Sequence, residues 1–480
     1  MTKNHCDRLN PGSAEGPHCA QTLQRGLSAR HIQLISIGGA IGTGLFMGAG
    51  KTLALSGTSI VLTYAIVGFF MFMVMRAMGE LLLTRLDYRS FADFVSEYLG
   101  PRASFFLGWS YWLSWVVTCI ADVVVCGGYV QYWLPNVSPW LPALLTLGFL
   151  CLFNMLSVKM FGEAEFWFAM IKVVAIVALI ATGAWMVFSG WTSPDGVTAS
   201  LHNVTDPAIF MPHGIFGFFA GFQIAIFSCT GIELLGTMSA ETKNPEKVLP
   251  KAINAVPVRI LLFYVLTLTV LMAIYPWNSI GQNGSPFVEI FSNLGISSAA
   301  NVLNVVVITA AISAINSDIF GAGRMMYGMA QDGQAPRSFT KLTASGVPWM
   351  TVLVMSVALL LAVVLNYLIP EKVFMIIASI ATFATVWVWL MILLSQIVMR
   401  RTLSPEETRQ LSFPVPWWPV APALATAFMA FVIGLLGYFE ESRIALYVGL
   451  VWIAFLTAAY WLWVRKKGGG SPVTTATQQM

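Results

Sequence analysis

The sequence predicts an all-α integral membrane protein with twelve transmembrane helices, and three observations carry this prediction. Of the 480 residues, 57% are hydrophobic and 10% are charged, and the mean hydropathy is +0.75; a soluble domain usually carries about 25% charged residues. Apolar runs of about 20 residues, the length needed to cross a bilayer, recur along the chain. The basic residues gather in alternate connections between these runs. The composition leaves more apolar surface than a soluble fold covers, which excludes a soluble enzyme.

The apolar runs divide the chain into consecutive predicted domains. Residues 1–30 form an N-terminal tail, 31–189 carry spans 1–5, 216–398 carry spans 6–10, 418–464 carry spans 11–12, and 465–480 form a C-terminal tail. The twelve spans are expected near 31–50, 55–76, 103–133, 140–157, 164–189, 216–236, 258–277, 297–323, 349–369, 373–398, 418–437 and 444–464.

The basic residues set the predicted orientation. Of the 26 Lys and Arg residues, only Lys51, Lys372 and Arg443 fall in predicted outer connections, and Lys172 falls inside a span. Because cytoplasmic loops carry an excess of Lys and Arg, both termini are predicted to be cytoplasmic. The first 30 residues lack the apolar core of a cleaved signal peptide, so the first span is expected to remain as a helix. The net charge of +4 is too small to indicate nucleic acid binding.

Three connections have distinct patterns. Residues 84–102 predict an amphipathic helix at the membrane surface, residues 237–257 are polar and then amphipathic, and residues 190–215 form a polar loop. The six cysteines are expected to be small packing residues without disulfides; they are Cys6, Cys19, Cys119, Cys126, Cys151 and Cys229. No CxxC or Cys/His spacing indicates a metal site, and no cofactor is expected.

The first span is rich in glycine, with six glycines in residues 38–50. Each weakens a helix by about 1 kcal/mol relative to alanine. One interpretation is close helix packing through pairs such as Gly38–Gly42. The other is a local break, which lipid tolerates only where the backbone is buried or lines a cavity. The density of glycine favours the break, which would expose backbone amides to a solute.

The sixth span carries a second candidate break, because FSCTGIELLG (residues 227–236) places small polar residues beside Glu233. The first and sixth spans correspond if spans 1–5 and 6–10 are two halves, which is typical of an inverted-repeat transporter with its site at the midplane. Helix ends at such breaks present N–H groups to a carboxylate and C=O groups to an ammonium. A small zwitterion such as an α-amino acid carries both groups.

Four ionisable residues lie within spans, where each costs roughly 2.5–3.5 kcal/mol and is a functional candidate. Lys172 either extends to the interface or gains and loses a proton in each cycle. Glu233 either accepts hydrogen bonds from freed N–H groups or takes part in coupling, and Asp122 is either a proton relay or a buried structural partner. Asp318 is expected to pair with Arg324.

Three further carboxylates lie at the predicted inner ends of spans. Glu80 ends span 2, and Glu163 and Glu165 begin span 5. All three are interpreted as interfacial residues.

Four segments together identify a resemblance. They are RGLSARHIQLISIGGAIGTGLFMGAGKTL, EFWFAMIKVVAI, GIELLGTMSAETKNPEKVLPKAIN and NSDIFGAGRMMYGMA. These segments resemble bacterial amino acid permeases of the amino acid–polyamine–organocation superfamily, over about residues 25–465. The resemblance implies a five-plus-five inverted repeat with broken helices 1 and 6 and two C-terminal helices, in the bacterial inner membrane. It also implies proton-coupled amino acid uptake by alternating access.

The resemblance also implies roles for individual residues. Ile41, Gly42, Thr43 and Gly44 match the loop that holds the substrate carboxylate. Phe227, Ser228 and Thr230 match the segment whose carbonyls hold the amino group, and Cys229 and Gly231 complete that segment. Glu233 matches an acid linked to proton sensing, and Lys172 matches a lysine that replaces a bound sodium ion, so no sodium dependence is expected. Asp122 joins these two residues as a candidate for proton coupling.

Two parts of the chain point to different substrates. The N-terminal half, including GGAIGTGLFMGAGKT, resembles permeases for D-serine, D-alanine and glycine, whereas the last third, including LNYLIPEKVF, resembles permeases for proline. The Ser228-Cys229-Thr230 triplet departs from both. We expect import of small neutral amino acids of the first type by proton symport, with proline or another neutral L-amino acid as the alternative.

Two other classes of function compete with transport. An amino-acid sensor that binds without transporting is favoured by a large soluble output domain, which the 480 residues do not contain. An enzyme embedded in the membrane needs catalytic side chains at one membrane face, yet the five His residues are dispersed. The expected partners are therefore the amino acid and the lipid bilayer, and the protein is expected to be a monomer or a weak homo-oligomer.

Overall fold

The computed structural model describes residues 41–464, except 157, 195, 240, 241, 243, 278–284 and 369–372. In this part of the chain the named elements are all helices, and Thr192 and Thr198 form an isolated β-bridge. The predicted all-α fold is therefore confirmed. Nine helices within the described residues are long and apolar enough to cross a membrane, and two shorter apolar helices accompany them, Trp140–Asn154 and Trp349–Val364.

The helices follow the predicted spans closely. The first of the nine, Gly44–Thr84, includes the end of the predicted span 31–50 and all of the predicted span 55–76, so the count of twelve remains a prediction. The elements that form the bundle are η1 (Gly44–Gly48), α2 (Ala49–Ser56), η2 (Gly57–Ser59), α3 (Ile60–Thr84), α5 (Pro101–Gln131), α6 (Trp140–Asn154), α7 (Val158–Ser189), α10 (Gly214–Cys229), α11 (Leu234–Thr237), α13 (Val256–Ile260), η4 (Leu261–Leu266), α14 (Thr267–Ile274), α16 (Ser297–Gln331), α17 (Trp349–Leu368), α18 (Val373–Thr402), α20 (Val420–Tyr438), α21 (Arg443–Ala459) and η7 (Tyr460–Val464).

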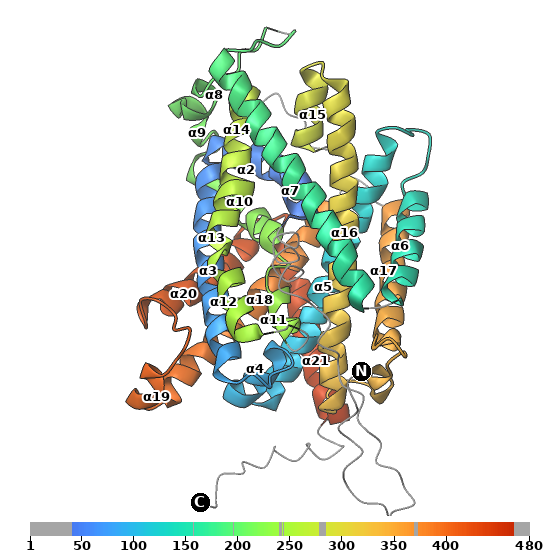
Figure 1. The fold of residues 1–480 in the computed structure, drawn as a ribbon, viewed down its shortest axis with the longest axis vertical. Coiled ribbons are helices and arrows are strands. Elements are labelled where there is room, and N and C mark those ends of the chain that lie inside the picture. Colours follow the sequence, from blue (N-terminus) through green and yellow to red (C-terminus); the bar gives the residue numbers. More distant parts are fainter. Residues whose placement is uncertain are drawn as a thin grey trace, which may run out of the picture.

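Shorter helices lie at the two ends of the bundle (Figure 1). At one end lie α8 (His202–Thr205), α9 (Pro207–Phe210) and α15 (Pro286–Asn293); at the other lie α4 (Phe91–Leu99), α12 (Pro245–Asn254), η6 (Arg337–Thr340) and α19 (Pro405–Arg409). Connections that the positive-inside pattern assigns to one side of the membrane thus lie at one end of the molecule. The segment 190–215, predicted as a polar loop, contains the two short helices α8 and α9.

The centre of the bundle is formed by α5, which packs against both α16 and α18. Most of α5 is buried, whereas α7 and α21 expose large apolar side chains such as Trp167, Phe188 and Leu450. Helices that are apolar on all sides are stable only inside a core or in lipid. The exposed apolar faces of α7 and α21 are therefore the surfaces that suit a bilayer.

The amphipathic helix predicted within residues 84–102 is present as α4. Ser90 caps it by accepting a hydrogen bond from the Ala92 N–H, as is usual for a helix N-terminus. Its apolar residues Phe91 and Phe94 are fully buried against the protein. The apolar face of α4 therefore completes the protein core, and its position at the membrane surface stays a prediction.

Glu80 was expected to be interfacial, and the structure shows that its carboxylate is buried. It forms an ion pair with Arg400 of α18, and the backbone N–H of Val415 and the Gln396 side chain also donate to it. The interpretation as an interfacial residue is wrong because the ion pair joins α3 to α18 inside the fold. A buried carboxylate requires such partners.

Candidate functional site

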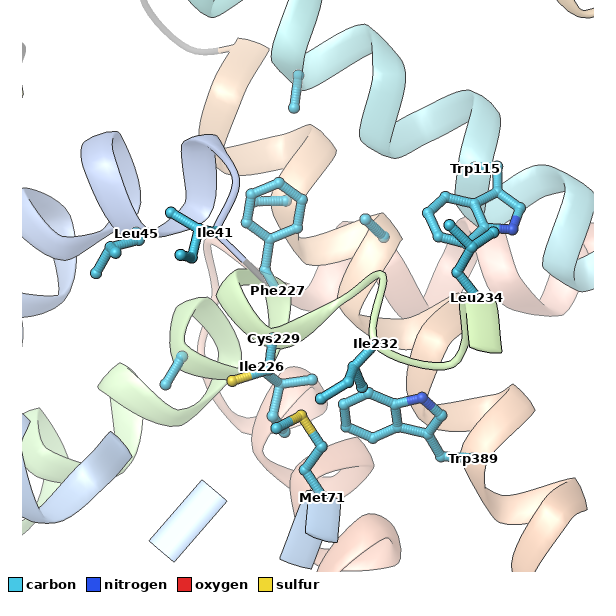
Figure 2. Close-up of a cluster of buried hydrophobic side chains, with 14 of the residues drawn as sticks. Ile41, Leu45, Met71, Trp115, Ile226, Phe227, Cys229, Ile232, Leu234 and Trp389 are labelled. Carbon is cyan, nitrogen blue, oxygen red and sulfur yellow. The ribbon is translucent and has the colours of Figure 1, made fainter. Parts of the chain in front are cut away.

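The predicted break in the sixth span is present. Helix α10 ends at Cys229, α11 begins at Leu234, and the four residues between them are not helical. Thr230 is extended, and Gly231 has a φ of 106°, which residues with a Cβ rarely adopt. Figure 2 shows Phe227 and Cys229 at the end of α10, and Ile232 in the loop that leads to Leu234.

The glycine-rich segment of the first span is described from residue 41 onward, and it is helical from Thr43. Residues 41 and 42 are not helical, and η1, a π-helix, follows from Gly44. π-Helical turns are rare and are frequent at functional sites. Residues 38–40 of this segment lie outside the described residues, so the predicted break in the first span stays a prediction; Ile41 and Gly42 are not helical, and the helix has begun before Gly44.

The glycine-rich segment of the first span meets the end of α10 beside the break in the sixth span. A Cβ built on Gly44 would lie 2.4 Å from the Cα of Ser228. The two backbones are therefore too close to leave room for a side chain at position 44. Between them lies a cavity of about 20 Å³, room for one or two water molecules. The predicted binding residues that line this cavity are Gly42, Thr43, Gly44, Phe227, Ser228, Thr230 and Gly231. Ile41 and Cys229 are fully buried beside the lining rather than in it.

The carbonyls expected to hold an amino group already accept hydrogen bonds. Tyr264 Oη donates to the Ser228 carbonyl at 2.6 Å, and the Thr230 N–H donates to the Phe227 carbonyl at 3.1 Å. A carbonyl oxygen accepts two hydrogen bonds, so each keeps one acceptor position. Tyr264 also stacks on Tyr64, whose hydroxyl lies 3.0 Å from Ser228 Oγ. The two tyrosines therefore hold the end of α10 in place.

Glu233 lies next to the break, where it binds the backbone. The Gly231 N–H lies 3.3 Å from both carboxylate oxygens, and Trp389 Nε1 donates to Oε2 at 3.3 Å. In Figure 2, Trp389 lies beside Ile232. The geometry corresponds to the first of the two interpretations, an acceptor for a freed N–H group.

Replacing Glu233 by Ala is expected to destabilise the protein by about 1–3 kcal/mol, because a buried N–H would lose its acceptor. Glu233→Gln keeps one carbonyl oxygen at the same reach and should lose less stability. Thermal unfolding of the purified variants in detergent measures both effects. A Glu233→Ala protein as stable as the wild type would show that Gly231 does not depend on this carboxylate.

Asp122 of α5 faces the cavity from the opposite side. It accepts a hydrogen bond from Thr43 Oγ1, which ties α5 to the first span, and its other oxygen has no hydrogen-bond partner among the described residues. Both oxygens belong to a buried side chain that lines the cavity. Asp122 is thus both a structural partner and a free acceptor.

Sequence reasoning missed several polar residues of the cavity. Thr118 and Ser317 are buried, line the cavity, and have hydroxyls without a hydrogen-bond partner in the described part of the chain. Trp115, Thr118 and Asp122 lie three and four residues apart on α5, so they share one helix face. That spacing of polar and aromatic residues within an apolar span was the signal available in the sequence.

Asp318 and Arg324, both of which the structure describes, do not form the expected ion pair with each other. Asp318 lines the cavity and accepts a hydrogen bond from Cys119 Sγ at 3.3 Å. Arg324 lies over the ring of Phe320 at 3.3 Å and donates to the Phe320 carbonyl. The expectation is wrong because six residues along a helix span about 9 Å, which separates the two groups.

Lys172 does not extend to the membrane interface, so that interpretation is wrong. Its side chain is fully buried, and Nζ donates to the Ile41 carbonyl at 3.1 Å and to Ser313 Oγ at 3.0 Å. The ammonium therefore joins α7 and α16 to the interrupted part of the first span. Lys172 does not itself line the cavity.

Glu165 was expected to be interfacial, and this too is wrong. The residue is fully buried, and it accepts hydrogen bonds at 2.6 Å from both Ser313 Oγ and Asn316 Nδ2 of α16. The polar face of α16 draws this carboxylate into the bundle, which the sequence of α7 alone does not show. Within the described residues no group of three or more His, Cys, Asp or Glu side chains is arranged to hold a metal ion.

Several bacterial transporters are similar to this chain over almost its whole length. It is 47% identical to the amino-acid permease AapA of Bacillus subtilis (strain 168) over 93% of the chain and 96% of that protein. It is also 47% identical to the D-serine/D-alanine/glycine transporter of Escherichia coli (strain K12), over 93% of the chain and 95% of the relative. The chain is 39% identical to the probable threonine/serine transporter YbxG of Bacillus subtilis (strain 168), over 92% of the chain and 95% of that protein.

The family model for amino acid permeases matches residues 31–468. The match covers both interrupted spans and every described residue of the cavity. These relatives are membrane transporters and not enzymes, in agreement with the nine apolar helices. The chain therefore belongs to the amino acid permease family.

Proposed function

We propose that this permease imports small neutral amino acids, of the D-serine, D-alanine and glycine type, by proton symport. The observation that carries the proposal is the cavity lined by residues of both the glycine-rich first span and the broken sixth span. In this proposal, backbone N–H groups near Gly42 bind the carboxylate of the amino acid. The carbonyls of Phe227 and Ser228 bind the amino group of the same molecule. One relative is a D-serine/D-alanine/glycine transporter, which supports this substrate class.

The small size of the cavity also favours a small substrate. About 20 Å³ is less than even glycine needs, so the bundle must open slightly to admit a solute. A larger side chain requires more displacement of α5 and α16. Selection by size alone is weak, since one methylene is worth about 1–3 kcal/mol.

Alternating access follows from the arrangement of the interrupted spans. We propose that residues 31–189 and 216–398 form the two halves of an inverted repeat, with α20 and α21 as two additional helices, in the bacterial inner membrane with both termini inside. The site then lies where the halves meet. Rocking of the interrupted spans against α5 and α16 opens the cavity to either side in turn.

Coupling to protons is assigned to the buried charges around the cavity. Lys172 binds the Ile41 carbonyl with a cationic side chain, at the place where a bound metal cation would otherwise satisfy freed carbonyls. We therefore propose that a proton on Lys172 takes this role and that transport needs no sodium. Asp122 and Glu233 are the two other proposed coupling residues.

A competition assay tests the substrate class. Purified full-length protein in liposomes, with an imposed inside-alkaline pH gradient, should take up labelled glycine. Unlabelled D-serine and D-alanine are expected to compete at least tenfold more strongly than L-proline or L-histidine, because the cavity is small. L-Threonine and L-serine belong in the panel because YbxG is named as a probable threonine/serine transporter. Strongest competition by L-proline would favour the alternative substrate.

The same liposomes separate symport from the alternatives. A protonophore should abolish accumulation above the external concentration, and replacing sodium by choline should leave it unchanged. Uptake that persists as exchange after the gradient is collapsed would contradict proton symport. Binding of glycine without any uptake would instead indicate a sensor.

A further inference from the structure

A chain of buried hydrogen bonds continues from Lys172 away from the cavity. Lys172 Nζ donates to Ser313 Oγ at 3.0 Å, and Ser313 Oγ in turn donates to Glu165 Oε2 at 2.6 Å. All three side chains are almost completely buried. The two bonds point in the same direction, from the ammonium to the carboxylate.

The far side of Glu165 is also fixed. Asn316 Nδ2 donates to Oε1 at 2.6 Å, and Asn154 Nδ2 donates to Asn316 Oδ1 at 2.8 Å. The Asn154 amide also donates to the Leu150 carbonyl. A buried polar network becomes rigid when each of its groups has a hydrogen-bond partner. This network leaves Glu165 in one orientation, with Oε2 facing Ser313.

We propose that Glu165 is the proton partner of Lys172, connected to it through the hydroxyl of Ser313. In the step, Lys172 Nζ passes one proton to Ser313 Oγ while Ser313 passes its own hydroxyl proton to Glu165 Oε2. The ammonium becomes a neutral amine, the carboxylate becomes a carboxylic acid, and Ser313 is unchanged. The charges of the pair cancel before and after the step, so no net charge is left in the low-dielectric interior.

This step has a direct mechanical consequence. A neutral amine binds the Ile41 carbonyl more weakly than an ammonium does, because a charge-assisted hydrogen bond is roughly twice as strong as a neutral one. Proton transfer to Glu165 therefore loosens the contact between α7 and the interrupted part of the first span. The inference rests on the proposed proton symport, and it assigns to Glu165 the step that couples the proton to movement of that span.

Other charged groups face this pair and limit the step. Asp122 of α5 and Asp318 of α16 are buried carboxylates that line the cavity, and the negative charge of Asp122 favours the charged form of Lys172. Helix α14, which also packs against α7, contributes no charged side chain. Glu165 lies seven residues before Lys172, about 10 Å nearer the start of α7, which the basic residues place on the inner side. The proton thus moves toward the cytoplasm.

Glu165→Gln tests the proposal, because it keeps the size of the side chain and cannot take up the proton. In liposomes with the purified full-length variant, we expect exchange of labelled glycine without a gradient to stay within about threefold of the wild type. With a pH gradient, the glycine concentration inside the liposomes should rise no higher than the concentration outside. The number of protons taken up per glycine, measured with an internal pH dye, should fall at least tenfold. Ser313→Ala, which interrupts the chain of hydrogen bonds, should show the same separation.

Glu163→Gln is the matched control, since Glu163 is a half-buried carboxylate on the same helix, two residues away; it should retain accumulation and proton uptake. Accumulation and proton uptake at wild-type level in Glu165→Gln would overturn the proposal. Equal loss of exchange and accumulation in both Glu165→Gln and Ser313→Ala would also overturn it, because the residue would then be structural. Wild-type liposomes that take up glycine without protons would contradict the proposed symport itself.

Discussion

Replacing Lys172 by Ala is expected to reduce the initial rate of amino acid uptake by about 10–100-fold. The ammonium holds the Ile41 carbonyl and Ser313 Oγ in a fully buried position. A hydrogen bond to a charged group contributes about 1.5–3 kcal/mol, and about 1.4 kcal/mol corresponds to a factor of ten. The substitution also leaves the buried Glu165 without its cation, which is costly in a low-dielectric site. Uptake of labelled glycine in intact cells across external pH measures the loss.

Lys172→Met separates charge from packing. Met fills nearly the same volume without an ammonium, so it should fail to transport as Ala does, at equal amounts of protein in the membrane. If either variant matched the wild type across external pH, the coupling role of Lys172 would be wrong. Recovery with Met alone would show that the site needs volume and not charge.

Gly44→Ala is expected to abolish transport and to lower stability by more than the 1–3 kcal/mol typical of an overpacked core. The new Cβ would lie 2.4 Å from Ser228 Cα and 3.0 Å from Ser228 N. Backbone atoms cannot rotate away, so η1 and the end of α10 must separate. Without this clash, alanine would favour the helix. Thermal unfolding of the purified variant and glycine uptake are the two measurements.

Two other glycines of the same segment provide graded controls. At Gly48 a Cβ would meet the Ile224 side chain at 2.9 Å, which is able to rotate, so Gly48→Ala should cost less. At Gly42 it would meet only Ala314 Cβ at 3.8 Å, an ordinary contact, so Gly42→Ala should retain wild-type stability. If Gly44→Ala were as stable as Gly42→Ala, the close approach of the two interrupted spans would be wrong.

Much of the fold was predictable because local composition decides it. Runs of apolar residues specify helices that must face lipid or a core, and the observed helices fall within a few residues of most predicted spans. The small polar residues after Phe227 likewise marked interrupted backbone, which the structure shows between α10 and α11. At Gly231 the positive φ of 106° shows why: the chain there adopts a conformation that other residues disfavour.

The charged residues were predicted less well, because their position along one helix does not show what the neighbouring helices present. Glu80 and Glu165 lie where hydropathy places the ends of spans, yet both are buried by partners distant in the sequence, Arg400 in one case and Ser313 in the other. Asp318 accepts a hydrogen bond from Cys119 of α5 and does not pair with Arg324 on its own helix.

The sequence by itself therefore determined the apolar helices, the family and the break in the sixth span, since each depends on residues close together in the chain. Only the tertiary structure decided which polar groups meet. It brought Gly44 against Ser228, placed Asp122 at the cavity, and joined Lys172 to Glu165 through Ser313. The physical reason is that a buried charge is stable only with its partners, and those partners come from other helices.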